Sequence, residues 1–236
     1  MMKYSVSKFI DVVLPKSKRG LTSNYFYRPI SICFSYLVAD LPISANMWTI
    51  VQIIVGVTGC VFFFLLNPIL GILFIQLSYL FDCVDGEIAR YKKQESTIGK
   101  YLDTVGHFLI IPLFYYSFSY YLNKKYGLEL LLIFGFLMSF STLIRMSKIY
   151  RFFSLNNYRD DELNTLNKSS KKIIKLLSYC LHNFVFTMNL FTLIIFISLF
   201  VEISIIEKIT ICVYGIFMTL ETIILLYLDG KTFIND

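Results

Sequence analysis

Long runs of hydrophobic residues dominate this chain, and short polar segments separate most of them. A helix needs roughly 20 apolar residues to cross the hydrocarbon layer of a bilayer, and six runs reach about that length. Only the stretch at residues 151–176 is both long and polar. The pattern therefore predicts an all-α integral membrane protein with six transmembrane helices, at about residues 46–66, 69–90, 99–122, 127–150, 179–200 and 206–228.

A short amphipathic pattern precedes these runs. Val6, Phe9, Ile10 and Val13 recur at helical spacing, and Pro15 ends the pattern. This predicts an N-terminal helix that lies in the membrane interface, with a frayed basic tail as the alternative. No linker rich in serine, glycine or proline divides the chain. We expect one membrane-embedded domain over residues 1–236, with an interfacial segment at 1–45 and the six-helix bundle at 46–228.

Composition agrees with a membrane location. Hydrophobic residues make up 56% of the chain and charged residues 16%, whereas soluble domains average about 25% charged. The net charge is +6, but the basic residues adjoin apolar runs, which favours a membrane surface over nucleic acid as their partner. The five cysteines are scattered and form no metal-binding or disulfide pattern.

The distribution of lysine and arginine predicts the orientation. With the N-terminus in the cytoplasm, eighteen of the 22 basic residues fall on the cytoplasmic side and three on the other, and Arg145 lies within a span. Basic residues accumulate on the cytoplasmic side of membrane proteins. We therefore expect a multi-pass protein of the cell (cytoplasmic) membrane whose two termini and whose segment 81–108 face the cytoplasm.

The segment 81–108 gathers acidic residues between two apolar runs. Five residues of its first half share an arc of about 140° on a helix, and three residues of its second half advance by four. Two adjacent antiparallel helices would aim both stripes at one point near the cytoplasmic surface. The first stripe holds Asp82, Asp85, Gly86, Ala89 and Arg90, and the second holds Gly99, Asp103 and His107.

These residue types suit chemistry at phosphorus. Several carboxylates in a partly desolvated place need a neutralising group. Oxygen ligands favour Mg²⁺ or Mn²⁺, which commonly also bind substrate phosphates. Arg90 offers a planar fork for phosphate, and Gly86 and Ala89 leave room for a ligand. The alternative is an interfacial cap of charges that pair with Lys92, Lys93 and lipid headgroups.

The spacing D-x2-D-G-x2-A-R-x8-G-x3-D-x3-H in this segment resembles the signature of the CDP-alcohol phosphotransferase (CDP-alcohol phosphatidyltransferase) family, D-x2-D-G-x2-A-R-x8-G-x3-D-x3-D. Every spacing agrees, and only His107 replaces an acidic residue. The run Ser44-Ala45-Asn46-Met47-Trp48-Thr49 is also similar to the T-P-N-x-x-T-like run of the family.

The resemblance implies an enzyme that transfers a phosphoalcohol group, most often phosphatidyl, from a CDP-alcohol to an acceptor hydroxyl and releases CMP. The donor would be CDP-diacylglycerol or a polar CDP-alcohol, and the acceptor an alcohol or alcohol phosphate. It also implies a homodimer in membrane lipid; the distribution of basic residues has already argued against a nucleic-acid partner. The implied nucleotide and pyrophosphate site comprises Asn46, Thr49, Gly86, Ala89 and Arg90. The implied ligands of Mg²⁺ or Mn²⁺ are Asp82, Asp85, Asp103 and His107. Of these ligands, the resemblance implies that His107 and Asp103 are also catalytic.

His107 is the one departure from the family pattern. A neutral imidazole can accept a proton near physiological pH, so it can serve as the general base. It can also bind a metal, which would shift the preference towards Mn²⁺ or a softer ion. Both roles stay open at this point, and so does the reading of the chain as an inactive member of the family.

The acceptor side is marked by Arg145 in the fourth predicted span. Charge inside a membrane is costly and commonly functional, so Arg145, followed by Lys148 and Arg151, is a candidate for binding a phosphate on the acceptor. Snorkelling to the interface is the alternative. His182, Asn183 and Asn189 would line the pocket or would bond between helices.

Two other functions fit the same charges. One is a cation-binding transporter, although the acidic cluster lies at the end of the spans rather than at their middle. The other is a catalytically inactive scaffold that binds CDP-alcohols. Release of CMP distinguishes the enzyme from both.

Overall fold

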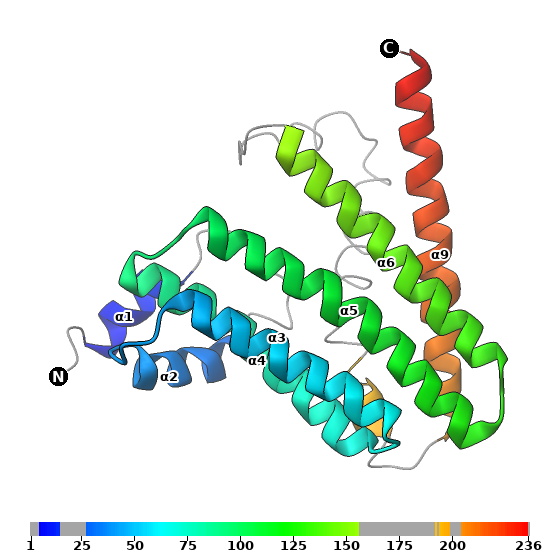
Figure 1. Cartoon of the computed structure of the whole chain (residues 1–236), viewed down its shortest axis with the longest axis horizontal. Helices are drawn as coiled ribbons and strands as arrows, with labels where there is room; N and C mark the ends of the chain where they lie inside the picture. The colour runs from blue at the N-terminus through cyan, green and yellow to red at the C-terminus, as the bar shows by residue number, and fades with distance from the viewer. Residues whose placement is uncertain (1–4, 15–26, 156–191, 193, 199–203, 236) are drawn as a thin grey trace.

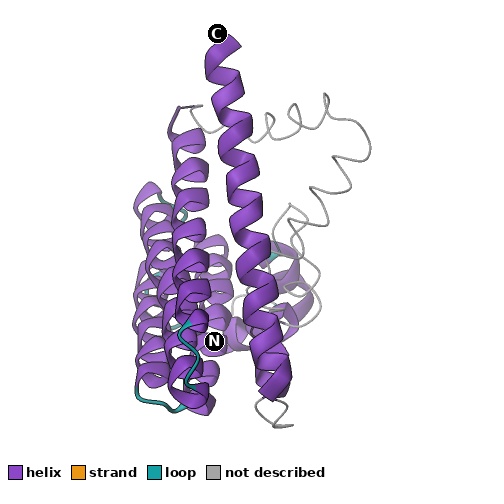
Figure 2. Cartoon of the chain, turned by 90° about the vertical axis from the view of Figure 1, so that its right-hand side faces the viewer, coloured by secondary structure: helices purple, strands orange, loops and turns teal. Residues whose placement is uncertain are grey.

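The structure, a computed structural model, describes residues 5–14, 27–155, 192, 194–198 and 204–235. Its ordered elements in these ranges are helices, and no strand occurs among the described residues (Figure 2). The predicted all-α class is confirmed. The helices are α1 (Val6–Val13), α2 (Arg28–Val38), α3 (Ala45–Phe64), α4 (Pro68–Lys92), α5 (Thr97–Tyr126), α6 (Leu130–Leu155) and α9 (Ser204–Asn235).

Three of the described helices are long and apolar enough to cross a membrane. They are α3, α4 and the Leu130–Ser147 part of α6, and α2 is a shorter apolar helix. Helices α5 and α9 are long, with 30 and 32 residues, and they coincide with two further predicted spans. The predicted span at residues 179–200 lies mostly outside the described residues. The count of six spans therefore stays a prediction.

Helix α3 is the centre of the part of the bundle that carries the motif. It packs along both α4 and α5, whereas α4 and α5 contact each other only briefly; α5 then packs on α6, and α6 on α9 (Figure 1). A side chain on Gly59 of α3 would place its Cβ 3.0 Å from the carbonyl oxygen of Gly71 on α4. Glycine thus permits the close helix contact, as small residues do in membranes. The two halves of the motif therefore meet against α3.

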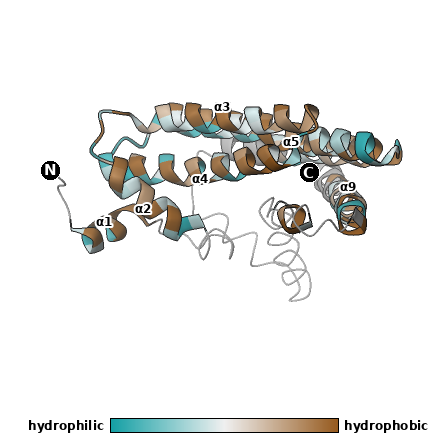
Figure 3. Cartoon of the chain, turned by 90° about the horizontal axis from the view of Figure 1, so that it is seen from below, coloured by the Kyte–Doolittle hydropathy of each residue, from teal (hydrophilic) through white to brown (hydrophobic). Residues whose placement is uncertain are grey.

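Helices α1 and α2 lie side by side beneath α4 (Figure 3). The hydrophobic pattern of the sequence does not predict α2, and the burial pattern of this helix explains why. Arg28, Ser31 and Ser35 recur at helical spacing and are buried, while Ile30 and Leu37 are 50% and 72% exposed. This inverted amphipathicity suits a helix whose outer face contacts lipid. In α1, Phe9 and Val13 are buried inside the protein; the interfacial position of α1 stays a prediction.

Hydrogen bonds tie the connector between α2 and α3 to the end of α4. Tyr91 Oη donates to Asp40 Oδ1 at 2.9 Å. Lys92 Nζ donates to the carbonyl oxygens of Leu41 and Ile43 at 2.6 and 2.7 Å. Because charged donors make the stronger hydrogen bonds, this connector fixes the start of α3 relative to the end of α4.

Candidate active site

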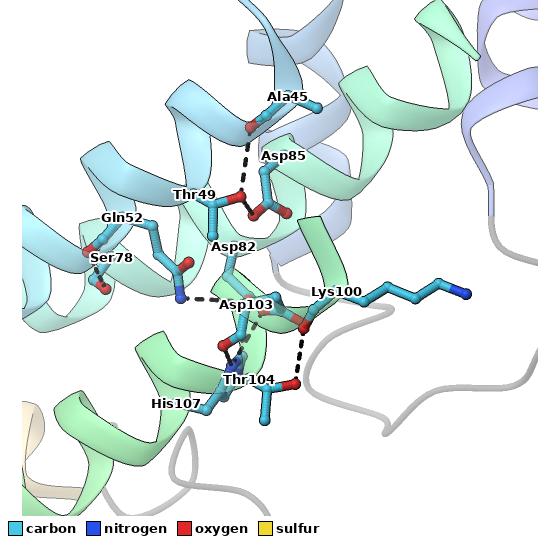
Figure 4. Close-up of polar contacts among 10 residues, drawn as sticks. All are labelled: Ala45, Thr49, Gln52, Ser78, Asp82, Asp85, Lys100, Asp103, Thr104 and His107. Atoms are coloured by element: carbon cyan, nitrogen blue, oxygen red, sulfur yellow. Dashed lines mark hydrogen bonds and ion pairs between the residues drawn. The ribbon is translucent and has the colours of Figure 1, made fainter. Parts of the chain in front are cut away.

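Three side chains of the motif converge between α4 and α5. Asp82 comes from α4, and Asp103 and His107 come from successive turns of α5 (Figure 4). One ligand atom from each lies within 4.8 Å of the others. His107 Nε2 is 3.6 Å from Asp82 Oδ1, and His107 Nδ1 is 3.2 Å from Asp103 Oδ1. The predicted convergence of the two stripes is thus present for these three residues.

The ring of His107 is oriented by its own helix. Nδ1 lies 2.9 Å from the main-chain oxygen of Asp103, one turn earlier. Because a carbonyl oxygen only accepts, Nδ1 carries the proton in this contact. The lone pair of a neutral ring then resides on Nε2, which faces Asp82. Metal-binding histidines commonly donate their other ring N–H to a carbonyl in this way.

Helix α3 supplies polar partners for both aspartates of α4. Thr49 Oγ1 donates to Asp85 Oδ2 at 2.6 Å, and Gln52 Nε2 lies 3.4 Å from Asp82 Oδ1 (Figure 4). Asp85 is 8% exposed and stands outside the group formed by Asp82, Asp103 and His107. The structure therefore brings together three of the four predicted metal ligands and turns the fourth towards Thr49.

The donor set suits a hard or borderline divalent cation. Two carboxylates and one imidazole nitrogen are within reach of one ion, and both Asp82 and Asp103 are only partly buried. Carboxylate oxygen and imidazole are ligands that Mg²⁺ and Mn²⁺ accept, Mn²⁺ more readily when nitrogen is included. The residues present thus fit the metal that the sequence implies.

Asn46 lies where α3 meets α5. A Cβ on Gly99 would stand 2.8 Å from Asn46 Oδ1, a distance too short for real carbon–oxygen contacts. The glycine of the motif therefore leaves room for Asn46 beside the first turn of α5. Ser96 caps the same turn by accepting a hydrogen bond from Gly99 N at 3.0 Å.

Arg90 contacts both Gly86 and the N-terminal helix. Its terminal nitrogens would lie 3.4 and 3.5 Å from a Cβ on Gly86, one turn earlier. Its Nε donates to the main-chain oxygen of Val13, at the end of α1, at 2.6 Å. The side chain is therefore oriented by the carbonyl end of α1, which carries partial negative charge. Ala89 is half-buried on the same turn of α4.

Arg145, predicted to bind the acceptor, has a carboxylate partner. It is 6% exposed on α6, and its Nη1 is 2.7 Å from Glu221 Oε2 on α9. The sequence pattern does not indicate this pair. The side chains of Lys148 and Arg151 and the residues His182, Asn183 and Asn189 lie outside the part whose side chains the structure describes.

Two polar residues near the site have no role assigned from the sequence. Gln52 lies three residues after Thr49 in an apolar run. Its presence indicates a polar partner, because an amide in such a run needs one. Glu87 is fully buried between α2 and α4. Its identity was visible inside the motif, but its partners on α2 were not.

Comparison with known proteins agrees with this geometry. The family model described as CDP-alcohol phosphatidyltransferase matches residues 42–224, which include the site. The chain therefore belongs to the CDP-alcohol phosphatidyltransferase family, and the resemblance seen in the motif is confirmed. The chain is also 33% identical over 86 residues to the bifunctional IPC transferase and DIPP synthase of Thermococcus kodakarensis, a match that covers 36% of this chain and 19% of that protein.

Proposed function

We propose that this protein is an integral membrane phosphotransferase that moves a phosphoalcohol group from a CDP-alcohol to an acceptor hydroxyl and releases CMP. The observation that carries the proposal is the convergence of Asp82, Asp103 and His107, with ligand atoms within 4.8 Å of one another, inside a chain that belongs to this family. An acidic cluster within a motif that also carries an arginine suits a diphosphate substrate.

The step is a displacement at the β-phosphorus of the donor. The acceptor oxygen forms a new bond to this phosphorus, and the bond from it to the oxygen shared with the α-phosphorus breaks. CMP leaves with the shared oxygen, and the hydroxyl proton passes to a base. Catalysis of phosphoryl transfer depends mainly on positioning and on neutralising charge. In this proposal Asn46, Thr49, Gly86, Ala89 and Arg90 hold the donor.

Asp82, Asp85, Asp103 and His107 are the proposed ligands of Mg²⁺ or Mn²⁺. A bound divalent cation would neutralise charge on the diphosphate. We assign His107 to the ligand set through Nε2, because its Nδ1 proton is directed at the carbonyl oxygen of Asp103. Asp103 is then the better candidate for the base, since half of its side chain is exposed.

The transferred group is proposed to be phosphatidyl, with a polar CDP-alcohol as the second donor class. The relative from Thermococcus kodakarensis carries the name DIPP synthase, which is a reason to include polar donors in any assay. Arg145 is proposed to face the acceptor. We further propose a homodimer in the cell membrane, with the site and both termini in the cytoplasm.

Release of CMP in lipid nanodiscs tests the proposal. The purified protein is given CDP-diacylglycerol or polar CDP-alcohols, each with a panel of alcohols and alcohol phosphates, with Mg²⁺, with Mn²⁺ or with a chelator. We expect CMP from at least one pair, dependent on the cation. Binding of a CDP-alcohol without any CMP would indicate the inactive scaffold. Neither binding nor CMP would leave a cation-binding membrane protein.

A further inference from the structure

A fully buried carboxylate inside the motif belongs to no ligand set proposed above. Glu87 follows Gly86 on α4, and its side chain has no exposed surface. Its two oxygens accept hydrogen bonds from Ser31 Oγ and Ser35 Oγ on α2, both at 2.7 Å. Arg28 Nη1 on α2 lies 3.8 Å from the same carboxylate. Removing one partner from such a buried charged group is strongly disruptive. The carboxylate thus fixes α2 on α4.

Helix α2 also contacts the first turns of α3. The ring of Phe34 on α2 packs edge-on against Trp48 of α3, with centroids 5.6 Å apart, and Trp48 also packs on Phe81 of α4 at 5.7 Å. Asn46 and Thr49, proposed to hold the donor, lie on the same first turns of α3. A shift of α2 would therefore remove one support of the turns that carry these two side chains.

Helix α2 also supports α1, the helix that orients Arg90. Tyr36 on α2 packs edge-on against Phe9 of α1, with ring centroids 5.3 Å apart. Both Phe9 and Val13 of α1 are buried, and the Val13 carbonyl accepts the hydrogen bond from Arg90 Nε at 2.6 Å. Phe9 also packs on Tyr91 of α4, with ring centroids 5.1 Å apart. Helices α2 and α4 together thus place the carbonyl that orients Arg90.

We infer that Glu87 is a positioning residue for the donor site. By fixing α2 on α4, it helps to hold the start of α3 and, through α1, the guanidinium of Arg90. It acts through these groups and is not proposed to contact the donor or a cation. The inference rests on the proposed function, because the assignment of Asn46, Thr49 and Arg90 to the donor is part of it.

A matched pair of variants tests this role. Glu87→Ala removes the carboxylate that fixes α2. Glu207→Ala removes an equally buried carboxylate, 1% exposed, which accepts from Lys125 Nζ and Tyr126 Oη between α5 and α9. That site lies roughly 40 Å along α5 from Gly99, given a rise of 1.5 Å per residue. Both variants lose a buried ion pair, but only the first loses contact between α2 and α4.

Two readouts are measured on both variants in nanodiscs. The first is the pair of kinetic constants in the CMP-release assay, the KM for the CDP-alcohol and kcat, whose changes are compared. The second is the fluorescence of Trp48, the single tryptophan of the chain, which reports on the junction of α2, α3 and α4 without any substrate. We expect Glu87→Ala to raise the KM for the donor about tenfold or more, because small misplacements of binding groups are costly. The change in kcat should be smaller, and the fluorescence emission of Trp48 should shift. Glu207→Ala should change neither. Glu87→Gln, which keeps the shape and one acceptor, should restore part of the affinity.

Several outcomes overturn the inference. A folded Glu87→Ala variant with the KM and Trp48 emission of the wild type contradicts it, as does an equal rise in KM for Glu207→Ala. If Glu87→Ala does not fold, the milder pair Ser31→Ala with Ser35→Ala replaces it, with the same expected shifts. If the wild type releases no CMP from any donor, the proposed function fails, and unchanged Trp48 emission in the variants would then refute the positioning role separately.

Discussion

His107 Nδ1 lies 2.9 Å from the main-chain oxygen of Asp103, so the helix itself fixes the ring. Nε2 is consequently left facing Asp82, at 3.6 Å from Oδ1. This places an imidazole where the family pattern has a carboxylate. The ring keeps a lone pair for a cation or a proton but contributes no negative charge.

Substitution of His107 separates its two roles. His107→Asp adds the carboxylate of the family pattern, so we expect the Mg²⁺ concentration for half-maximal CMP release to fall about tenfold. His107→Ala should raise that concentration by a similar factor while saturating cation restores much of the rate. Titration of CMP release with each cation, together with direct binding of Mn²⁺ by electron paramagnetic resonance, measures both. If the His107→Ala variant binds the cation as the wild type does but no longer releases CMP, His107 is instead the base.

Thr49 is predicted to hold Asp85 in its orientation. Thr49→Val removes the 2.6 Å hydrogen bond and leaves a buried carboxylate oxygen with one donor fewer, which costs about 1–3 kcal/mol. Thermal unfolding in detergent should show the loss, with slower CMP release. Thr58→Val is the control on the same helix, because the Thr58 hydroxyl donates to the carbonyl oxygen of Ile54. Equal destabilisation by both variants would refute a special role for Thr49.

Gly99 is predicted to be required for the placement of Asn46. Gly99→Ala would put a Cβ 2.8 Å from Asn46 Oδ1 and displace that side chain, so the KM for the donor should rise about tenfold. A double-mutant cycle that combines Gly99→Ala with Asn46→Ala tests this mechanism. Because both changes act on one contact, their effects should be far from additive. Additive effects would show that Gly99 acts elsewhere.

Arg145 and Glu221 are predicted to act as a pair in the stability of the α6–α9 contact. Glu221→Ala leaves the buried guanidinium without its 2.7 Å partner, which should cost about 3–5 kcal/mol of unfolding free energy. Arg145→Met with Glu221→Met should recover most of that loss. The double variant also tests the acceptor proposal, since an unchanged KM for the acceptor would show that Arg145 is structural only.

The sequence was sufficient for the helical class, the family and the convergence of Asp82, Asp103 and His107. These follow from apolar run lengths and from residues spaced by three and four along single helices. The position of α3 between α4 and α5 did not follow, because the sequence pattern does not show which helices pack together. Helix α2 was missed because its buried face is the polar one, the reverse of the pattern in a soluble helix.

Pairings between distant residues were also beyond the sequence. Glu87 lies 56 residues from Ser31, and Arg145 lies 76 residues from Glu221. Each is a charged residue in an apolar setting, which indicates that a partner exists. Nothing in the linear pattern selects that partner, because it depends on which helices pack together. Spacing within one helix therefore cannot identify these partners, whereas the tertiary structure does.

The most direct test of the account compares Asp103→Asn with the wild type in cation-dependent CMP release. Asp103 is proposed as both ligand and base, so the neutral amide should reduce the rate by about 10²–10⁴-fold. Asp40→Asn is the control, because Asp40 is an exposed acid at the same end of the bundle that accepts from Tyr91; it should retain the rate. CMP release by Asp103→Asn at the wild-type rate, with unchanged dependence on Mg²⁺ or Mn²⁺, would contradict the proposed site.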